Sequence, residues 1–182
     1  MNMAGHPRWV SSLISSAGSG EPEDLMRLSC RLALASMEHG GGPFGALIAD
    51  GSGQIVAAGW NTVISDSDST AHAEANCIRQ ALKALAVTNL KEADCAPYSL
   101  FSSAAPCIQC FGMIYWSGLS RVYAAARKED VEAIGFDEGP ISEILWKEAQ
   151  RKKGIVFIPD FCRDSEALLP LQAYHKQGGR IY

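Results

Sequence analysis

The sequence predicts an α/β fold, because segments with helical periodicity alternate along the chain with short apolar runs typical of strands. The 182 residues are 47% hydrophobic, which is enough to bury one core and makes a single domain the default. No internal repeat or linker divides the chain. We therefore expect a layered domain with a partly parallel sheet.

The first twenty residues differ in composition from the rest. Residues 1–20 are rich in serine and glycine around one short apolar patch, so we expect a flexible N-terminal extension before a domain of residues 21–182. A helix should begin at Glu21, where acidic residues precede leucines at helical spacing, and it should end at Gly40.

A hairpin should follow that helix. Residues 44–49 and 54–60 are apolar runs on either side of residues 50–53, whose sequence Asp-Gly-Ser-Gly is typical of a turn. Further apolar runs between polar loops predict a helix over 71–86, a strand over 98–102, a helix from 107 through 116, a strand over 121–126, an acidic loop, a helix over 142–152, a strand over 155–159 and a last helix from 164.

His72, Cys107 and Cys110 have the spacing of a zinc site that leaves one coordination position free for water. Pro106 suits the first turn of a helix, which would place both sulfurs on one face of a helix N-terminus, where the thiolate form is favoured. Thr70 is a good N-cap, so His72 should also lie at a helix start. Two helix starts are thus expected to hold one zinc ion per subunit.

Glu74 is expected to act as a proton shuttle and not as a ligand. Residues two apart on a helix do not share a face, so Glu74 turns away from the ligand shell when His72 points at the metal. Two thiolates weaken zinc as a Lewis acid, and a nearby base is then needed to help ionise the water. Glu74 would take that proton and return protons to a ring nitrogen and to the leaving ammonia of an amidine-like ring.

A structural zinc site is the alternative, and it would normally need a fourth Cys or His ligand. The other histidines lack metal-type spacing, and the other cysteines are scattered singly, as small buried apolar groups are. These residues are His6, His39 and His175, and Cys30, Cys77, Cys95 and Cys162.

Composition limits the partners. A net charge of −4 gives the chain no general attraction for nucleic acid. Free cysteines are typical of a reducing compartment, and no apolar run approaches the roughly 20 residues that a membrane helix needs. We therefore expect a cytoplasmic protein that does not bind a membrane and has no general affinity for nucleic acid; the chemistry of the zinc box instead predicts a small-molecule partner.

Several of these segments together resemble the guanine deaminase branch of the cytidine deaminase-like superfamily. The boxes at 70–74 and 106–110 specify only the superfamily, which includes cytidine, cytosine, deoxycytidylate and tRNA adenosine deaminases. The Gly-Phe-Asp-Glu segment at 135–138 and an aromatic C-terminal residue are similar to the guanine-type branch. Residues 41–46, Asn61 and residues 114–117 add to the resemblance, which runs from about residue 22 to the end.

The resemblance implies a three-layer α/β/α fold with a central mixed five-stranded sheet. It implies zinc-dependent hydrolysis of a free purine base, guanine, to xanthine and ammonia. It also implies a homodimer, in which the C-terminal segment of one subunit crosses to cover the active site of the other.

Site residues beyond the zinc box follow from the resemblance. It implies that Asn61 and Ala73 bind the purine, that Glu138 contacts the ring and assists proton transfer, that Phe44 forms a wall near the ring, and that Tyr182 closes over the base. A purely structural role is the alternative for four of these residues. Asn61 could be a turn residue at a strand end, Phe44 a core residue, Glu138 a solvated loop acid and Tyr182 a frayed terminus.

Two positions depart from the family pattern. Ala105 stands where the family usually has Glu, and Gln109 replaces a common Met between the cysteines. Neither is a metal ligand, so the site can still assemble. The missing carboxylate leaves open a weaker zinc affinity, altered activity, a shifted substrate range or an engineered site.

Other functions stay open at this point. The substrate could be another aminated heterocycle, such as an ammeline-type triazine, guanosine or cytosine. A tRNA adenosine deaminase-like subunit would need a basic groove for phosphates, which the acidic balance opposes. A non-catalytic zinc scaffold is the third alternative, and an intact Glu74 opposes it.

Overall fold

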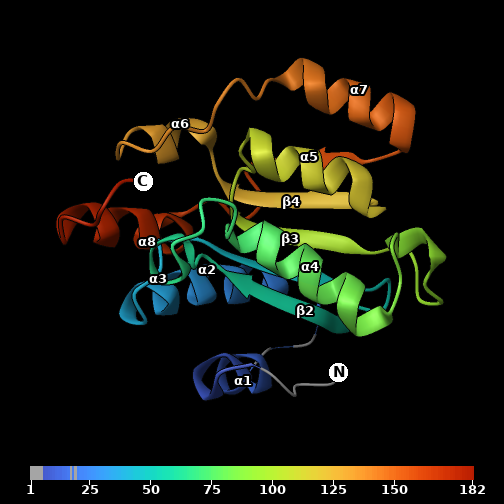
Figure 1. The fold of residues 1–182 in the computed structure, drawn as a ribbon, viewed down its shortest axis with the longest axis horizontal. Helices are drawn as coiled ribbons and strands as arrows, with labels where there is room; N and C mark the ends of the chain where they lie inside the picture. Colours follow the sequence, from blue (N-terminus) through green and yellow to red (C-terminus); the bar gives the residue numbers. More distant parts are fainter. Residues whose placement is uncertain (1–5, 17, 19) are drawn as a thin grey trace.

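A single mixed sheet of five strands lies at the centre of the computed structural model, which describes residues 6–16, 18 and 20–182. The strand order is β2-β1-β3-β4-β5 (Figure 1). β1 pairs antiparallel with β2 and β3, whereas β3, β4 and β5 run parallel, so the predicted mixed sheet is confirmed. The strands are β1 (Gly45–Ala49), β2 (Ile55–Trp60), β3 (Ser99–Ala104), β4 (Arg121–Ala126) and β5 (Val156–Ile158).

Helices cover both faces of the sheet, which gives the expected three layers (Figure 1). One layer consists of α2 (Pro22–Glu38) and α8 (Ser165–Lys176), with α1 (Arg8–Ser15) packed on α2. The opposite layer consists of α4 (Ala73–Leu85), α5 (Ile108–Ser117) and α7 (Glu143–Lys153). Short elements in the loops are α3 (Val63–Asp66), η1 (Leu90–Glu92) and α6 (Lys128–Glu132), the last of which lies in the predicted acidic loop.

The central strands are buried on both faces. In β3, Leu100 packs in the core under α4 and α5, while the adjacent Phe101 packs in the core under α2. In β1, Ile48 packs in the core under α4 and α5, and Leu47 packs in the core under α2. Because successive side chains of a strand point to opposite faces, a strand between two helical layers presents apolar side chains to both, as these pairs do.

Strand direction brings the candidate residues to one edge of the sheet. β2 and β3 are both antiparallel to β1, so they end at the edge where β1 begins. Phe44 directly precedes β1, Asn61 directly follows β2, and Cys107 follows β3 after two residues. Positions far apart in sequence therefore meet there.

The extension predicted before residue 21 contains a helix in its described part. In α1, Val10 is fully buried against the α2 side of the core, and Trp9 stacks on His39 with ring centroids 4.5 Å apart. The apolar patch thus forms the buried face of a short amphipathic helix, which the serine- and glycine-rich composition did not indicate. Residues 1–5, 17 and 19 lie outside the described residues, and the flexibility of the extension stays a prediction.

Within the described ranges, every helix is too short or too polar to cross a bilayer.

Gly59 should be intolerant of a side chain, because β2 and α4 touch at this residue. A β-carbon there would lie 2.2 Å from the Ala73 carbonyl oxygen and 2.6 Å from the Cys77 amide nitrogen. Since both are backbone atoms, α4 would have to move. We expect G59A to lower the free energy of unfolding by about 1–3 kcal/mol in urea titrations.

The matched control for this substitution is Gly112 in α5, where an added β-carbon would meet nothing within 4 Å. G112A should raise the free energy of unfolding by ~0.5–1 kcal/mol, because alanine favours the helix. A G59A protein as stable as the wild type would contradict the close approach of β2 and α4.

Candidate metal and substrate site

A cavity of about 210 Å³ opens at the sheet edge where β1 begins and β2 and β3 end. Its walls include all the predicted site residues except Ala73 and Cys110. The predicted residues that line it are Phe44, Asn61, His72, Glu74, Cys107, Glu138 and Tyr182.

His72 lies at the start of α4, as predicted, although the capping residue differs. α4 begins at Ala73, and His72 itself occupies the N-cap position. Thr70 is not the N-cap, because its amide and its hydroxyl both donate to Asp68 Oδ1, each at 2.7 Å. The side chain of Asp68 thus shapes the turn that delivers His72 to the cavity.

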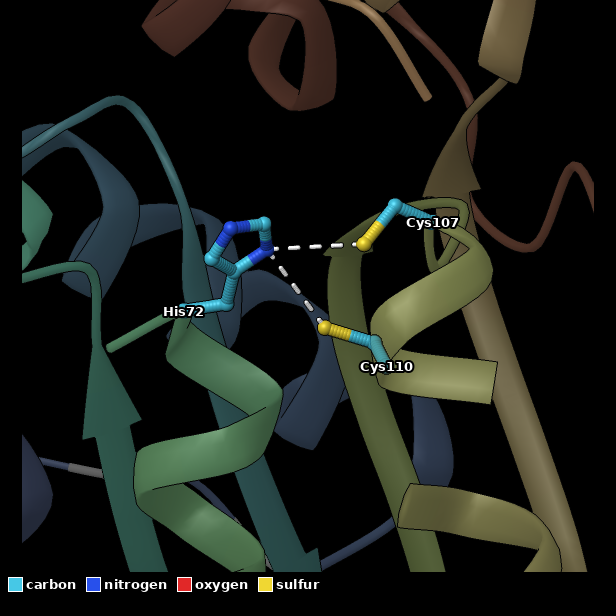
Figure 2. Close-up of side chains that lie close together, drawn as sticks. All are labelled: His72, Cys107 and Cys110. Atoms are coloured by element: carbon cyan, nitrogen blue, oxygen red, sulfur yellow. Dashed lines mark hydrogen bonds between the residues drawn. The ribbon is translucent and has the colours of Figure 1, made fainter. Parts of the chain in front are cut away.

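Both cysteines lie at the start of α5, also with a shift of the helix start. α5 begins at Ile108 with Cys107 at the N-cap, so Pro106 precedes the first turn and does not lie in it. Figure 2 shows His72 Nδ1 facing both sulfurs, at 3.5 Å from Cys107 Sγ and 3.6 Å from Cys110 Sγ. The predicted meeting of two helix starts is therefore observed.

The three side chains fit a zinc ion. Their ligand atoms lie within 4.8 Å of one another, and no fourth His, Cys, Asp or Glu joins the group in the part of the chain that the structure describes. Tetrahedral coordination with Zn–S near 2.3 Å and Zn–N near 2.0 Å separates nitrogen from sulfur by roughly 3.6 Å, which matches the two observed distances. The donor set thus leaves one tetrahedral position for a non-protein ligand.

The sulfurs are electrostatically prepared for a cation. A hydrogen bond from the Cys110 thiol, together with the adjacent His72, lowers the pKa of Cys107 to about 4. The pKa of Cys110 is raised, because this buried thiol keeps the proton that the two sulfurs share. A thiolate at a helix N-terminus is the form that zinc binds.

Glu74 lies beside the metal group without belonging to it. Its side chain is buried and lines the cavity, with Oε2 lying 3.3 Å from Cys110 Sγ. Burial, reinforced by the negative charge of Cys107, raises the pKa of Glu74. A buried carboxyl group with a raised pKa next to a free coordination position is suited to take up and release protons.

Glu138 supplies a second buried carboxyl group to the cavity. It is 8% exposed, so it is not a solvated loop acid. Burial, with the charges of Cys107 and Glu74, raises the pKa of Glu138 to about 8. At neutral pH this carboxyl group is largely protonated in the metal-free protein and can both donate and accept hydrogen bonds.

Asn61 presents a donor that lacks a partner. The residue is 1% exposed, and its Nδ2 is a buried polar atom with no hydrogen-bond partner among the described residues. Its Oδ1 accepts from the Val63 amide at 3.2 Å, which fixes the side chain at the end of β2. An unpaired buried donor costs about 1–3 kcal/mol, so a ligand acceptor at this point would offset that cost.

Aromatic side chains form the rest of the wall. Phe136 packs edge-on against Phe44 with ring centroids 5.2 Å apart, and edge-on against Tyr182 at 5.0 Å. Tyr182 is therefore part of an ordered contact with the pocket of its own chain. Burial raises the pKa of its hydroxyl group, so the group stays neutral.

Ala73 is the predicted residue that the structure does not place on the cavity wall. It is fully buried in the core between α4 and β2, with its carbonyl oxygen close to Gly59. Its contact with a substrate stays a prediction, which the placement of its side chain does not support.

Several wall residues had no predicted role, among them Phe136, Val63 and Ser69. Phe136 stood within the quoted Gly-Phe-Asp-Glu segment but received no role, although it joins Phe44 to Tyr182. Val63 and Ser69 come from the loop between β2 and α4, where no pattern in the sequence distinguished them.

The two unusual positions have different surroundings. Gln109 Nε2 donates to the Thr70 carbonyl oxygen at 3.2 Å and thus ties the start of α5 to the loop before His72. Ala105 lines the site cavity and also a neighbouring cavity of about 360 Å³. A longer side chain at Ala105 would project into one of them.

Comparisons with known proteins agree with this geometry. The family model of the cytidine and deoxycytidylate deaminase zinc-binding region matches residues 19–126. Guanine deaminase of Bacillus subtilis (strain 168) is 37% identical over 154 residues, which are 84% of this chain and 92% of that protein. A solved guanine deaminase from Nitrosomonas europaea is 34% identical over 94% of both chains, with a TM-score of 0.86. A solved complex with 2,6-diaminopurine is 35% identical over 100% of this chain and 98% of the other, with a TM-score of 0.85.

Loss of one sulfur should abolish stable metal binding. We expect the wild-type chain to retain one zinc ion after dialysis and C110A to lose it, because two donors hold the ion far less tightly than three. Metal analysis by plasma mass spectrometry measures both. C30A is the matched control, since Cys30 is equally buried but lies in α2, away from the cavity. A C110A protein with full zinc content would disprove the assignment of this ligand.

Proposed function

Because the chain belongs to the cytidine and deoxycytidylate deaminase zinc-binding family, we propose that it hydrolyses the free base guanine to xanthine and ammonia. The chain is a zinc-dependent aminohydrolase, and the proposal concerns its substrate. The observation that carries the proposal is the unpaired Nδ2 of Asn61, a buried donor in a cavity that also holds the carboxyl group of Glu138. Together they form a polar pair for a planar base.

The polar groups match the edges of guanine. Asn61 Nδ2 would donate to a ring or carbonyl acceptor of the base, while its Oδ1 stays bonded to the Val63 amide. Glu138 would contact a ring N–H group, and its raised pKa lets it donate or accept as the ring changes protonation. The similarity to guanine deaminases supports this assignment of the base.

The size and closure of the cavity support a free base. A volume of about 210 Å³ lies below the roughly 300–1,000 Å³ of pockets for drug-sized ligands. Phe44 and Phe136 offer ring faces and edges to a flat heterocycle, and Tyr182 covers the pocket from the C-terminus. A ribose on the base would have to displace Tyr182.

The chemistry needs an activated water and a residue that moves protons. Zinc bound by His72, Cys107 and Cys110 supplies a Lewis acid that makes the attacking water more acidic. Glu74 takes a proton from the water, delivers it to ring atom N3, and passes the second proton to the exocyclic nitrogen. The water oxygen adds to C2 as N3 takes the first proton, and the bond from C2 to the exocyclic nitrogen then breaks as that nitrogen takes the second, so guanine and water give xanthine and ammonia.

Turnover of guanine by the zinc-loaded protein tests this proposal. We expect ammonia and xanthine in equal amounts, and we expect E74Q to keep its zinc while kcat falls by about 10²–10⁴-fold, the usual contribution of a general acid–base. E143Q, which changes an exposed glutamate of α7, should leave kcat unchanged. Faster turnover of cytosine, guanosine, ammeline or tRNA adenosine than of guanine would disprove the substrate, and full turnover by E74Q would disprove the role of Glu74.

We also propose that the protein is a homodimer whose C-terminal segments exchange. Exposed apolar side chains support association, among them Trp116 at 69% and Ile144 at 71% exposure. The segment that ends in Tyr182 follows the turn at Gly178 and Gly179, and the contacts it makes with its own chain could be made equally by a partner's segment.

A complementation experiment distinguishes exchange from simple dimerisation. E74Q retains Tyr182 but lacks the proton shuttle, whereas a chain truncated after Ile181 retains Glu74 but lacks the closing ring. If the segments exchange, mixed dimers contain one complete site, and refolding the two inactive chains together should restore guanine turnover. Dimers without restored turnover would show that each segment closes its own site. A monomeric mass by light scattering would contradict both the dimer and the exchange of segments.

A further inference from the structure

We propose that Asn76 is a positioning residue that holds Asn61 in register with His72. Asn76 lies on α4 one turn after His72 and does not line the cavity. The inference rests on the proposed function, since it gives Asn61 the role of binding the base. Asn76 itself would touch neither the substrate nor the metal, and it would act only through the residues to which it is hydrogen-bonded.

The side-chain amide of Asn76 connects two segments of the site. Nδ2 lies 2.9 Å from the Trp60 carbonyl oxygen, 3.1 Å from Thr62 Oγ1 and 3.2 Å from the Ala71 carbonyl oxygen. Trp60 and Thr62 are the two neighbours of Asn61, and Ala71 directly precedes His72. The NH₂ group of Asn76 thus links the two neighbours of Asn61 to the residue that precedes His72.

Arg79 determines which way this amide faces. Its Nη2 donates to Asn76 Oδ1 at 2.6 Å. Arginine has donors only, so the oxygen of Asn76 must face Arg79 and the nitrogen must face the three acceptors. The amide orientation therefore follows from the chemistry of its partners.

The Asn76 amide reinforces a loop that already positions Asn61. Thr62 N donates to the Ala71 carbonyl oxygen at 3.0 Å, and Val63 N donates to Asn61 Oδ1. The first bond spans the same separation as Asn76, between residue 62 and residue 71, and the second ties the Asn61 side chain to the segment that the first bond holds. Release of Asn76 would let the Asn61 amide shift, and a displacement near 1 Å is enough to lower reactivity about 10²-fold.

A substitution series separates a hydrogen-bonding role from simple space filling. N76A removes the donor, whereas N76D keeps the size and the contact with Arg79 but turns an acceptor towards two carbonyl oxygens. If Asn76 only filled space, N76D would behave like the wild type. If its NH₂ group positions the loop, N76D should be at least as impaired as N76A.

Binding of 2,6-diaminopurine provides the main measurement. All variants carry zinc and the E74Q substitution, so that calorimetry measures affinity without turnover. We expect N76A and N76D to weaken Kd by about tenfold, the loss of roughly one buried hydrogen bond. N89A is the matched control, because Asn89 also bonds two backbone groups, the Trp116 carbonyl oxygen and the Lys91 amide, but lies outside the cavity. N89A should change Kd by less than about twofold.

A double-mutant cycle tests whether Asn76 acts through Asn61. In an N61A background, N76A should weaken Kd by less than about twofold, because the group that it positions is absent. An equal loss of affinity in both backgrounds would overturn the proposal, and so would an N76D protein that binds like the wild type.

Amide hydrogen exchange gives a readout that needs no substrate. The Thr62 and Val63 amides should exchange about tenfold faster in N76A than in the wild type, since their acceptors become mobile, while N89A leaves them unchanged. Unchanged exchange in N76A would refute the positioning role. If the wild type neither binds 2,6-diaminopurine nor deaminates guanine, the proposed function fails, and this exchange measurement alone then decides whether Asn76 holds the loop.

Discussion

The crowding of negative charge where α4 and α5 begin is the constraint on which the rest of the site depends. Glu74, Glu138 and Cys107 are buried within one small cavity, where burial and then the charge of Cys107 raise the pKa of both carboxyl groups, and Glu74 adds to the shift of Glu138. Such a group of acids is unfavourable in a protein interior in its charged form unless a cation offsets it. A dication held by His72 and the two sulfurs would offset that charge, so metal binding would favour the ionised forms of the buried acids.

The fold meets this constraint with backbone that can approach closely. Gly59 lets β2 touch α4, which places the start of α4 directly beside the end of the strand that carries Asn61. Gly42 has a similar function at the opposite wall, where a β-carbon would lie 2.0 Å from the Tyr182 hydroxyl and 3.1 Å from Asn61 Oδ1. Asn61 and the C-terminal Tyr182 therefore meet at one glycine, and a side chain at Gly42 would displace the Tyr182 hydroxyl and crowd Asn61.

The sequence was sufficient to predict the three metal ligands and the order of helices and strands, because ligand spacing and hydrophobic periodicity are local properties. It was insufficient where tertiary contacts decide. Thr70 has the chemistry of an N-cap, yet its hydroxyl group donates to Asp68 and does not cap α4. The apolar patch near Trp9 forms a helix that packs on α2. Asn76 carries no motif at all. Its importance follows from three acceptors that the chain brings together only after β2, the loop and α4 have folded.

The two departures from the family pattern can be understood through the same charge balance. A glutamate in place of Ala105 would bring a further carboxyl group to the edge of a cavity that already holds two. Alanine avoids that charge and leaves only a small side chain between the site cavity and its larger neighbour. Gln109 meanwhile provides a neutral link between the two helix starts through Thr70. Gln109 and Asn76 thus both donate to carbonyl oxygens of the segment that precedes His72, those of Thr70 and Ala71, and they support this segment without adding a further carboxylate to the cavity.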